Sequence, residues 1–319
     1  MYNDVDIKFL PRGWERGFST KEKDYIDSFD IVFSENKQPG FKKNKEGVYK
    51  LRIIDKSKKA DVIFEHLIKM KRNIDFVINV RTKYESDDFL SASAYLLRFE
   101  KKYEYYDGWD EDKYNSFKLV CMSKGDIDFA CKTWEHIGKI YAKPQSGLKK
   151  CFEGFAGATN YELSEDSIIS DALFSYLVEN NIDESFFRPV YQKNGKRWAY
   201  ILDGSSSPLP AKTVKCNLHT GPYICPKCGR NVWRINEELN NSFNNAFENQ
   251  VVLGNPNIFE YWTIDQTVIK DLKPVNITND YFLANRLTLV NKELFEMIRE
   301  KNTDITKHSI PIFQNNAGL

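Results

Sequence analysis

The sequence has no long apolar run, and no basic, apolar segment opens it. Nowhere do about 18 apolar residues follow one another, so no transmembrane helix is predicted. The opening residues, Met1 to Asp6, are polar and acidic, unlike the start of a secretory signal. We therefore expect a cytoplasmic protein that does not contact a membrane.

The chain also has almost no net charge. Its 46 Lys and Arg residues offset 45 Asp and Glu residues, which leaves a formal charge of +1. Such a balance gives no general field toward the phosphate backbone of DNA or RNA. Nucleic acid is therefore not the expected partner on charge alone.

Familiar catalytic motifs are missing. The sequence contains no G-x-x-x-x-G-K-[ST], G-x-G-x-x-G, H-E-x-x-H or G-x-S-x-G motif. Of its four histidines, His66, His136 and His308 have no neighbouring nucleophile or orienting group. No catalytic or cofactor-binding residue is predicted. An enzyme built from scattered carboxylates stays an alternative, because such a site leaves no local signal.

The composition is that of a folded protein with substantial sheet. Apolar residues make up 41% of the 319 residues, charged residues 29% and aromatic residues 14%. Aromatic side chains favour pleated, half-buried surfaces. We expect an α+β fold with mixed or antiparallel sheets and flanking helices. A Gly-rich connector at 147–157 divides it into an N-terminal domain, 1–150, and a second domain, 151–319.

Periodicity predicts the main elements. Asn194-Gly195 between two alternating runs is a strong hairpin signal, joining strands at 187–191 and 197–202. Apolar spacing and Ser164 as a cap predict a helix over 165–179. The other expected strands are 48–54, 75–80, 92–106, 117–122 and 308–314, and the other expected helices are 61–70, 126–141 and 291–301.

The second half contains a possible internal repeat. The helix at 165–179 precedes Arg188-Pro-Val-Tyr-Gln192, and the helix at 291–301 precedes Ile310-Pro-Ile-Phe-Gln314. Both segments therefore run helix, polar loop, and then Pro-aliphatic-aromatic-Gln. This pattern is consistent with a duplicated helix–strand unit or with a chance match of a common pattern.

The strongest chemical signal is a cluster of metal-ligating residues at 213–233. Cys225-Pro-Lys-Cys228-Gly229 has the spacing of a zinc knuckle, in which two thiolates of one tight turn bind one ion. Cys216-x-x-His219 offers a second pair of ligands close by. The sequence therefore predicts one structural Zn²⁺ held by four ligands: Cys216, His219, Cys225 and Cys228.

Two alternatives apply to this cluster. Cys225 and Cys228 could form a redox dithiol, but the strand-like flanks differ from the helix start where such pairs normally lie. A distant cysteine, such as Cys151, could replace His219 as the fourth ligand. Four protein ligands would close the coordination shell, as in a structural rather than a catalytic site.

From about Tyr161 to Gln314 the chain resembles the double-CXXCG and related families of bacterial immunity proteins. The resemblance lies in the segment Phe186-Phe-Arg-Pro-Val190, the knuckle at 225–229, and the closing helix with Ile310-Pro-Ile312. Only one CXXCG is present, and Cys216-x-x-His219 stands in place of a second. The resemblance covers about half of the chain.

The resemblance implies a non-enzymatic protein that binds and neutralises a cognate protein toxin. The acidic segment from Asp107 to Asp112 would suit a basic toxin, because opposite charges steer association. A zinc-knuckle protein that binds nucleic acid is the alternative, with Lys227, Arg230 and Arg234 beside the metal.

Overall fold

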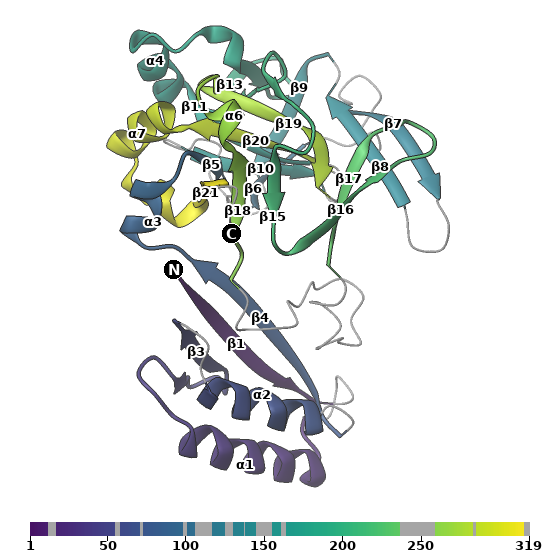
Figure 1. Cartoon of the computed structure of the whole chain (residues 1–319), viewed down its shortest axis with the longest axis vertical. Helices are drawn as coiled ribbons and strands as arrows, with labels where there is room; N and C mark the ends of the chain where they lie inside the picture. The colour runs from purple at the N-terminus through teal and green to yellow at the C-terminus, as the bar shows by residue number, and fades with distance from the viewer. Residues whose placement is uncertain are drawn as a thin grey trace. The chain divides into compact units, whose positions relative to one another are not determined.

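The chain folds as an α+β protein with mixed and antiparallel sheets, and its computed structural model divides it into two compact units (Figure 1). Unit 1 comprises Met1–Ser86 and Ile235–Glu260, and unit 2 comprises Asp87–Arg234 and Tyr261–Leu319. The boundary expected near residue 150 lies outside the described residues. These are 1–11, 17–54, 58–70, 73–97, 101–105, 117–124, 130–136, 138–144, 155–160, 164–236, 259–282 and 285–315.

Unit 1 is a four-stranded antiparallel sheet with two helices on one face. The strands lie in the order β2-β3-β1-β4, and β1 pairs with β4 along its whole length. Ser19 and Glu22 form a capping box that fixes the start of the first helix. The elements are β1 (Tyr2–Leu10), α1 (Thr20–Glu35), β2 (Lys42–Lys43), β3 (Tyr49–Ile53), α2 (Lys58–Met70) and β4 (Asp75–Lys83).

The core of unit 1 lies between this sheet and the helices. Residues of β1 alternate, so that Val5, Ile7 and Phe9 are buried. Phe29 of α1 meets Tyr49 of β3 edge-on, with ring centroids 4.8 Å apart. Such aromatic pairs add about 0.5–1.5 kcal/mol beyond the area that they bury. The opposite face of the sheet carries mostly charged residues.

Unit 2 contains a closed six-stranded barrel in the order β10-β11-β13-β12-β9-β6. Helix α4 (Asp171–Glu179) and the 3₁₀ helix η3 (Glu184–Phe186) connect the second and fourth strands of this order. The strands are β6 (Lys101–Tyr105), β9 (Ile140–Pro144), β10 (Phe155–Asn160), β11 (Ser164–Ser170), β12 (Phe187–Tyr191) and β13 (Arg197–Leu202).

A nine-stranded sheet forms the rest of this unit, in the order β15-β18-β21-β5-β20-β19-β17-β16, with β14 paired to β19. Its helices are α6 (Gln266–Ile269), α7 (Lys292–Lys301) and the 3₁₀ helix η5 (Thr303–His308), and α3 (Ser86–Ser91) precedes β5. The strands are β5 (Ala94–Leu97), β14 (Pro208–Leu209), β15 (Val214–Cys216), β16 (His219–Ile224), β17 (Asn231–Ile235), β18 (Trp262–Asp265), β19 (Val275–Phe282), β20 (Asn285–Asn291) and β21 (Ser309–Asn315).

The barrel and the nine-stranded sheet repeat one topology. In the barrel, β12 is parallel to β9 and antiparallel to β13, while β10 is parallel to β6. In the sheet, β21 is parallel to β18 and antiparallel to β5, while β19 is parallel to β14. Helix α7 lies between β20 and β21 as α4 lies between β11 and β12. The two Pro-containing segments therefore lie in strands, β12 and β21, that have corresponding partners in the barrel and in the sheet.

The two equivalent helices contact each other. The Tyr176 hydroxyl donates to the Glu300 carboxylate at 3.1 Å, and the Lys301 Nζ lies 4.2 Å from the Tyr176 ring centroid. Leu173 and Leu177 of α4, and Leu294 and Ile298 of α7, are buried on their respective sheets.

Each copy carries a β-hairpin at the same point of its topology. The hairpin of β7 (Phe117–Lys124) and β8 (Ala130–His136) comes between β6 and β9. The hairpin of β16 and β17 comes between β15 and β18, which are the equivalent strands of the second copy. These two insertions carry the three cysteines described below.

Two expected helices are wrong in part. Of the segment expected as a helix at 126–141, residues 130–136 form β8 and residues 140–141 begin β9, where pairing with β7 and β6 satisfies the backbone. The N-cap of α4 is Ser170, not Ser164, because Ser164–Ser170 pairs with β10 and β13 as β11. Among the described helices, none combines the length and apolar character needed to cross a membrane.

Candidate metal centre

The turn between β16 and β17 has the compact form expected of the knuckle. The Gly229 N–H donates to the Cys225 carbonyl at 2.8 Å, and the Cys225 N–H donates to the Arg230 carbonyl at 2.9 Å. Gly229 has φ +69°, a left-handed conformation that glycine adopts without steric cost. Both cysteines of the turn are thereby held close together.

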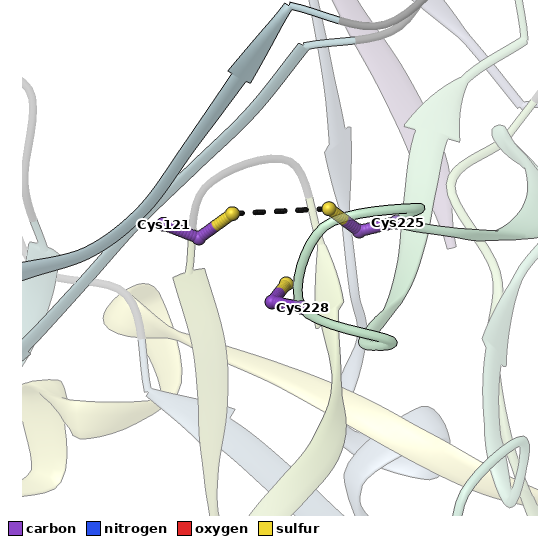
Figure 2. Close-up of side chains that lie close together, drawn as sticks. All are labelled: Cys121, Cys225 and Cys228. Atoms are coloured by element: carbon purple, nitrogen blue, oxygen red, sulfur yellow. Dashed lines mark hydrogen bonds between the residues drawn. The ribbon is translucent and has the colours of Figure 1, made fainter.

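A third cysteine joins this turn from the other hairpin. The sulfurs of Cys121, Cys225 and Cys228 all lie within 4.8 Å of one another. Figure 2 shows Cys121 on strand β7 facing the loop that carries the other two. Cys121 and Cys225 are only 2% and 1% exposed, whereas Cys228 is partly exposed. The three thiols thus converge from segments about a hundred residues apart in the chain.

The spacing fits a shared metal ion. The Cys121 and Cys225 sulfurs are 3.8 Å apart. Two sulfurs bound at about 2.3 Å to one tetrahedral zinc ion are about 3.8 Å apart. A disulfide would need about 2.05 Å, and the two residues are present as thiols. Thiolates favour Zn²⁺ over hard cations such as Mg²⁺.

Apolar and cationic groups surround the three cysteines. Val232 and Tyr281 pack with Cys121 and Cys225 in one buried cluster. The Arg230 guanidinium lies 5.3 Å from the Tyr281 ring centroid. Burial keeps water away from the sulfurs of Cys121 and Cys225, which suits a metal-bound cluster.

A buried carboxylate fixes β17 to the sheet next to this cluster. Asp280 of β19 is 3% exposed and accepts three hydrogen bonds. The donors are the Lys212 N–H at 2.7 Å, the Asn231 side-chain amide at 3.0 Å and the Trp233 indole at 3.0 Å. The strand that follows the knuckle is therefore anchored at the third and fifth residues after Cys228.

The other two predicted ligands are not part of this group. Cys216 ends β15, where its backbone pairs with Trp262, and its sulfur accepts the Leu218 N–H at 3.5 Å. The His219 ring packs beside Trp262 and Phe282, with centroid distances of 5.5 and 5.6 Å. Among the residues that the structure describes, the convergent set is Cys121, Cys225 and Cys228. The other proposed ligand, Cys151, lies outside those residues.

Cys121 gave no local signal in the sequence. It stands alone on a strand, 104 positions before Cys225, with no neighbouring ligand at a knuckle spacing. The number of ligands did not point to it either, because Cys216 and His219 already completed the predicted set of four.

Two of the three cysteines, Cys121 and Cys225, are buried, which is more typical of a structural ion than of a catalytic one. Catalysis by zinc needs an open coordination position that water or substrate can reach. A bound ion would cross-link the two hairpins through the sulfurs of Cys121, Cys225 and Cys228.

No protein-family model, curated protein or solved structure matches the chain. The resemblance to bacterial immunity proteins therefore rests on the motifs of this sequence alone. Of those motifs, the structure places Phe187–Tyr191 in β12 and Ser309–Asn315 in β21, which are equivalent strands of the two copies.

Proposed function

We propose that the chain is a binding protein that neutralises a partner protein, in the manner of the bacterial immunity proteins it resembles. One observation carries this proposal, namely the charged outer face of the unit 1 sheet. The sheet's inner face packs on α1 and α2, and its outer face carries exposed charged side chains.

This outer face is hollow and rich in cations. A depression of about 570 Å³ lies over β1, β3 and the strands beside them. Five basic side chains line it against two carboxylates. The charged lining residues are Asp4, Asp6, Lys42, Lys50, Arg52, Arg81 and Lys83.

The ion pairs within this face involve two of the five basic side chains and are weak, so the face can still attract an acidic partner. Arg52 lies 3.7 Å from Asp4, and Lys50 lies 3.8 Å from Asp6. All four side chains are 41–51% exposed, and exposed pairs of this kind contribute only about 0–1 kcal/mol. A partner with an acidic surface could therefore exchange these pairs for its own at little cost and would be steered toward the face.

Arg52 is also held in position. Its guanidinium lies 4.4 Å from the Tyr2 ring centroid, a cation–π contact. Gly40, at φ +88°, passes so close that an added Cβ would lie 2.9 Å from the Arg52 Cβ. A preorganised cation loses less conformational freedom on binding, which favours affinity.

The acidic segment Asp107 to Asp112, expected to meet a basic toxin, lies outside the described residues. The described surface supports an acidic partner instead. The buried cysteine cluster supports a structural role for the metal, which leaves recognition to surfaces such as this one.

The test is charge reversal on this face. The double variant Arg52→Glu/Arg81→Glu should weaken binding to the cognate toxin by about tenfold or more, and should reduce protection of cells from it. Lys21→Glu/Lys23→Glu on the exposed side of α1 changes the net charge equally and should leave both unchanged.

Three results would count against the proposal. The wild-type chain could fail to co-purify with that toxin or to protect cells. The two double variants could weaken binding equally, which would mean that net charge, not this face, matters. Salt-dependent binding of DNA or RNA that only Arg52→Glu/Arg81→Glu abolishes would favour the nucleic-acid alternative.

A further inference from the structure

The cysteine cluster has three ligands where a structural zinc site has four. Structural zinc is almost always tetrahedral and bound wholly by protein ligands. A fourth ligand must lie within reach of Cys121, Cys225 and Cys228. We propose that Cys131 is this ligand, so that four thiolates hold one zinc ion, two from each of the inserted hairpins.

Strand register places Cys131 beside Cys121. In the hairpin, Cys121 pairs with Thr133 and Ser123 pairs with Cys131. The register shift lies before Cys121, so the ladder from Cys121 to Lys124 is regular. Residues two apart on a strand, and the residues opposite them, share one face of the pleat. Cys131 is therefore the diagonal neighbour of Cys121 in the strand register.

This separation suits two ligands of one ion. Diagonal neighbours across an antiparallel pair are about 7–8 Å apart, with their Cβ atoms somewhat closer. Two thiolates on one zinc ion have their sulfurs about 3.8 Å apart, and each side chain adds a further Cβ–Sγ bond. Cys121 and Cys131 can thus bind the same ion without a change in the strand pairing.

The two inserted hairpins meet at the cysteine cluster. The hairpin β7–β8 and the hairpin β16–β17 occupy equivalent places in the two copies, and one sulfur of the first lies 3.8 Å from a sulfur of the second. With Cys131 included, each hairpin supplies two thiolates, and the ion joins the two copies across their equivalent insertions. This assignment does not depend on whether the chain neutralises a partner.

The first experiment uses the wild-type full chain. We expect one zinc ion per chain by elemental mass spectrometry. Alkylation mapped by peptide mass spectrometry should find Cys131 protected together with Cys121, Cys225 and Cys228, and all four should become reactive when a chelator is added. A Cys131 that reacts at the same rate with and without the chelator would overturn the proposal, as would a chain purified without zinc that binds none on addition.

The second experiment compares matched variants. Cys131→Ser should weaken zinc binding by more than about 100-fold in chelator competition, since loss of outer partners alone costs about 10–100-fold. Cys216→Ser and Cys151→Ser should bind zinc as the wild type does. The Co²⁺-loaded wild type should show the visible absorption of four thiolates, and Cys131→Ser that of three.

The reverse pattern would refute the assignment. A Cys131→Ser chain with wild-type zinc affinity and Co²⁺ spectrum would exclude Cys131, and loss of zinc in Cys216→Ser or Cys151→Ser alone would identify another fourth ligand. If Cys131→Ser does not fold, the alkylation pattern of the wild type decides the question by itself.

Discussion

The indole N–H of Trp233 donates a 3.0 Å hydrogen bond to the carboxylate of Asp280, which lies on the neighbouring strand β19. Asp280 also accepts bonds from Asn231 and from the Lys212 backbone. We predict that Asp280→Ala destabilises unit 2 by about 3 kcal/mol, because it leaves buried donors without an acceptor. Urea unfolding followed by tryptophan fluorescence measures this. The exposed Asp271→Ala is the control, and an equal effect of both changes would contradict the prediction.

Gly204 lies where the first copy passes into the second. An added Cβ would lie 2.4 Å from the Asn276 carbonyl carbon and 2.7 Å from the Ile277 nitrogen, both backbone atoms. We expect Gly204→Ala to cost about 2–3 kcal/mol of unfolding free energy, because the sheet cannot yield as a flexible side chain would. Gly195→Ala should cost only about 1 kcal/mol, since a left-handed φ of +79° is its sole obstacle. Thermal unfolding of both variants would show whether this order holds.

Removing the metal should affect the two units differently. Chelation should lower hydrogen-exchange protection in β16 and β17 by about tenfold or more, because the ion would cross-link their turn to strand β7. Peptides from α2, in unit 1, should be unchanged. The variant Cys225→Ser should reproduce the effect without a chelator. Uniform loss of protection in both units, or no loss in β17, would show that the cluster does not act as a local cross-link.

Unit 1 should become less stable in mild acid. Burial, with a smaller contribution from Lys69, lowers the pKa of His66 below its usual value of about 6.5. The unfolded chain therefore takes up this proton first as the pH falls, and the free energy of unfolding decreases below about pH 6.5. Urea titrations followed by NMR signals of α2 at pH 7.5 and 5.5 measure the loss.

His66→Gln should make that loss smaller, since glutamine does not titrate and can still bond to Ser28, whose hydroxyl lies 3.3 Å from the His66 Nε2. A direct NMR titration that placed the His66 pKa above 6.5 would reverse the expected sign.

Local patterns predicted the elements of unit 1 only where one face is clearly apolar. The strands at 48–54 and 75–80 and the helix at 61–70 correspond to β3, β4 and α2. Strand β1 was not recognised, because alternate positions carry Asp4 and Asp6 and the segment reads as a polar terminus. Its partners on both sides, β3 and β4, define it as a central strand.

In the candidate site, too, the sequence predicted the residues that are close together in the chain and missed the one that is distant. Cys225 and Cys228 were found from spacing, because one turn holds both. Cys121 depends on the pairing of β7 with β8 and on the packing of that hairpin beside another, and neither leaves a pattern in the neighbouring residues. Likewise, the repeat of helix and Pro-containing strand was visible, but the equivalence of the two strand orders was not.

The position of β5 has a consequence for the descent of this chain. In the first copy, β13 follows β12 through the tight turn at Gln192–Lys196 and lies between β11 and β12. In the second copy, the strand between β20 and β21 is β5, which comes before all the other strands of both copies in the sequence. This order would result from two tandem copies in which circular permutation moved the last strand of the second copy to the N-terminal side of the first. The Ser93 N–H donates to the Ile312 carbonyl at 2.8 Å, so an ancestor could have run from β21 into β5 through one short turn.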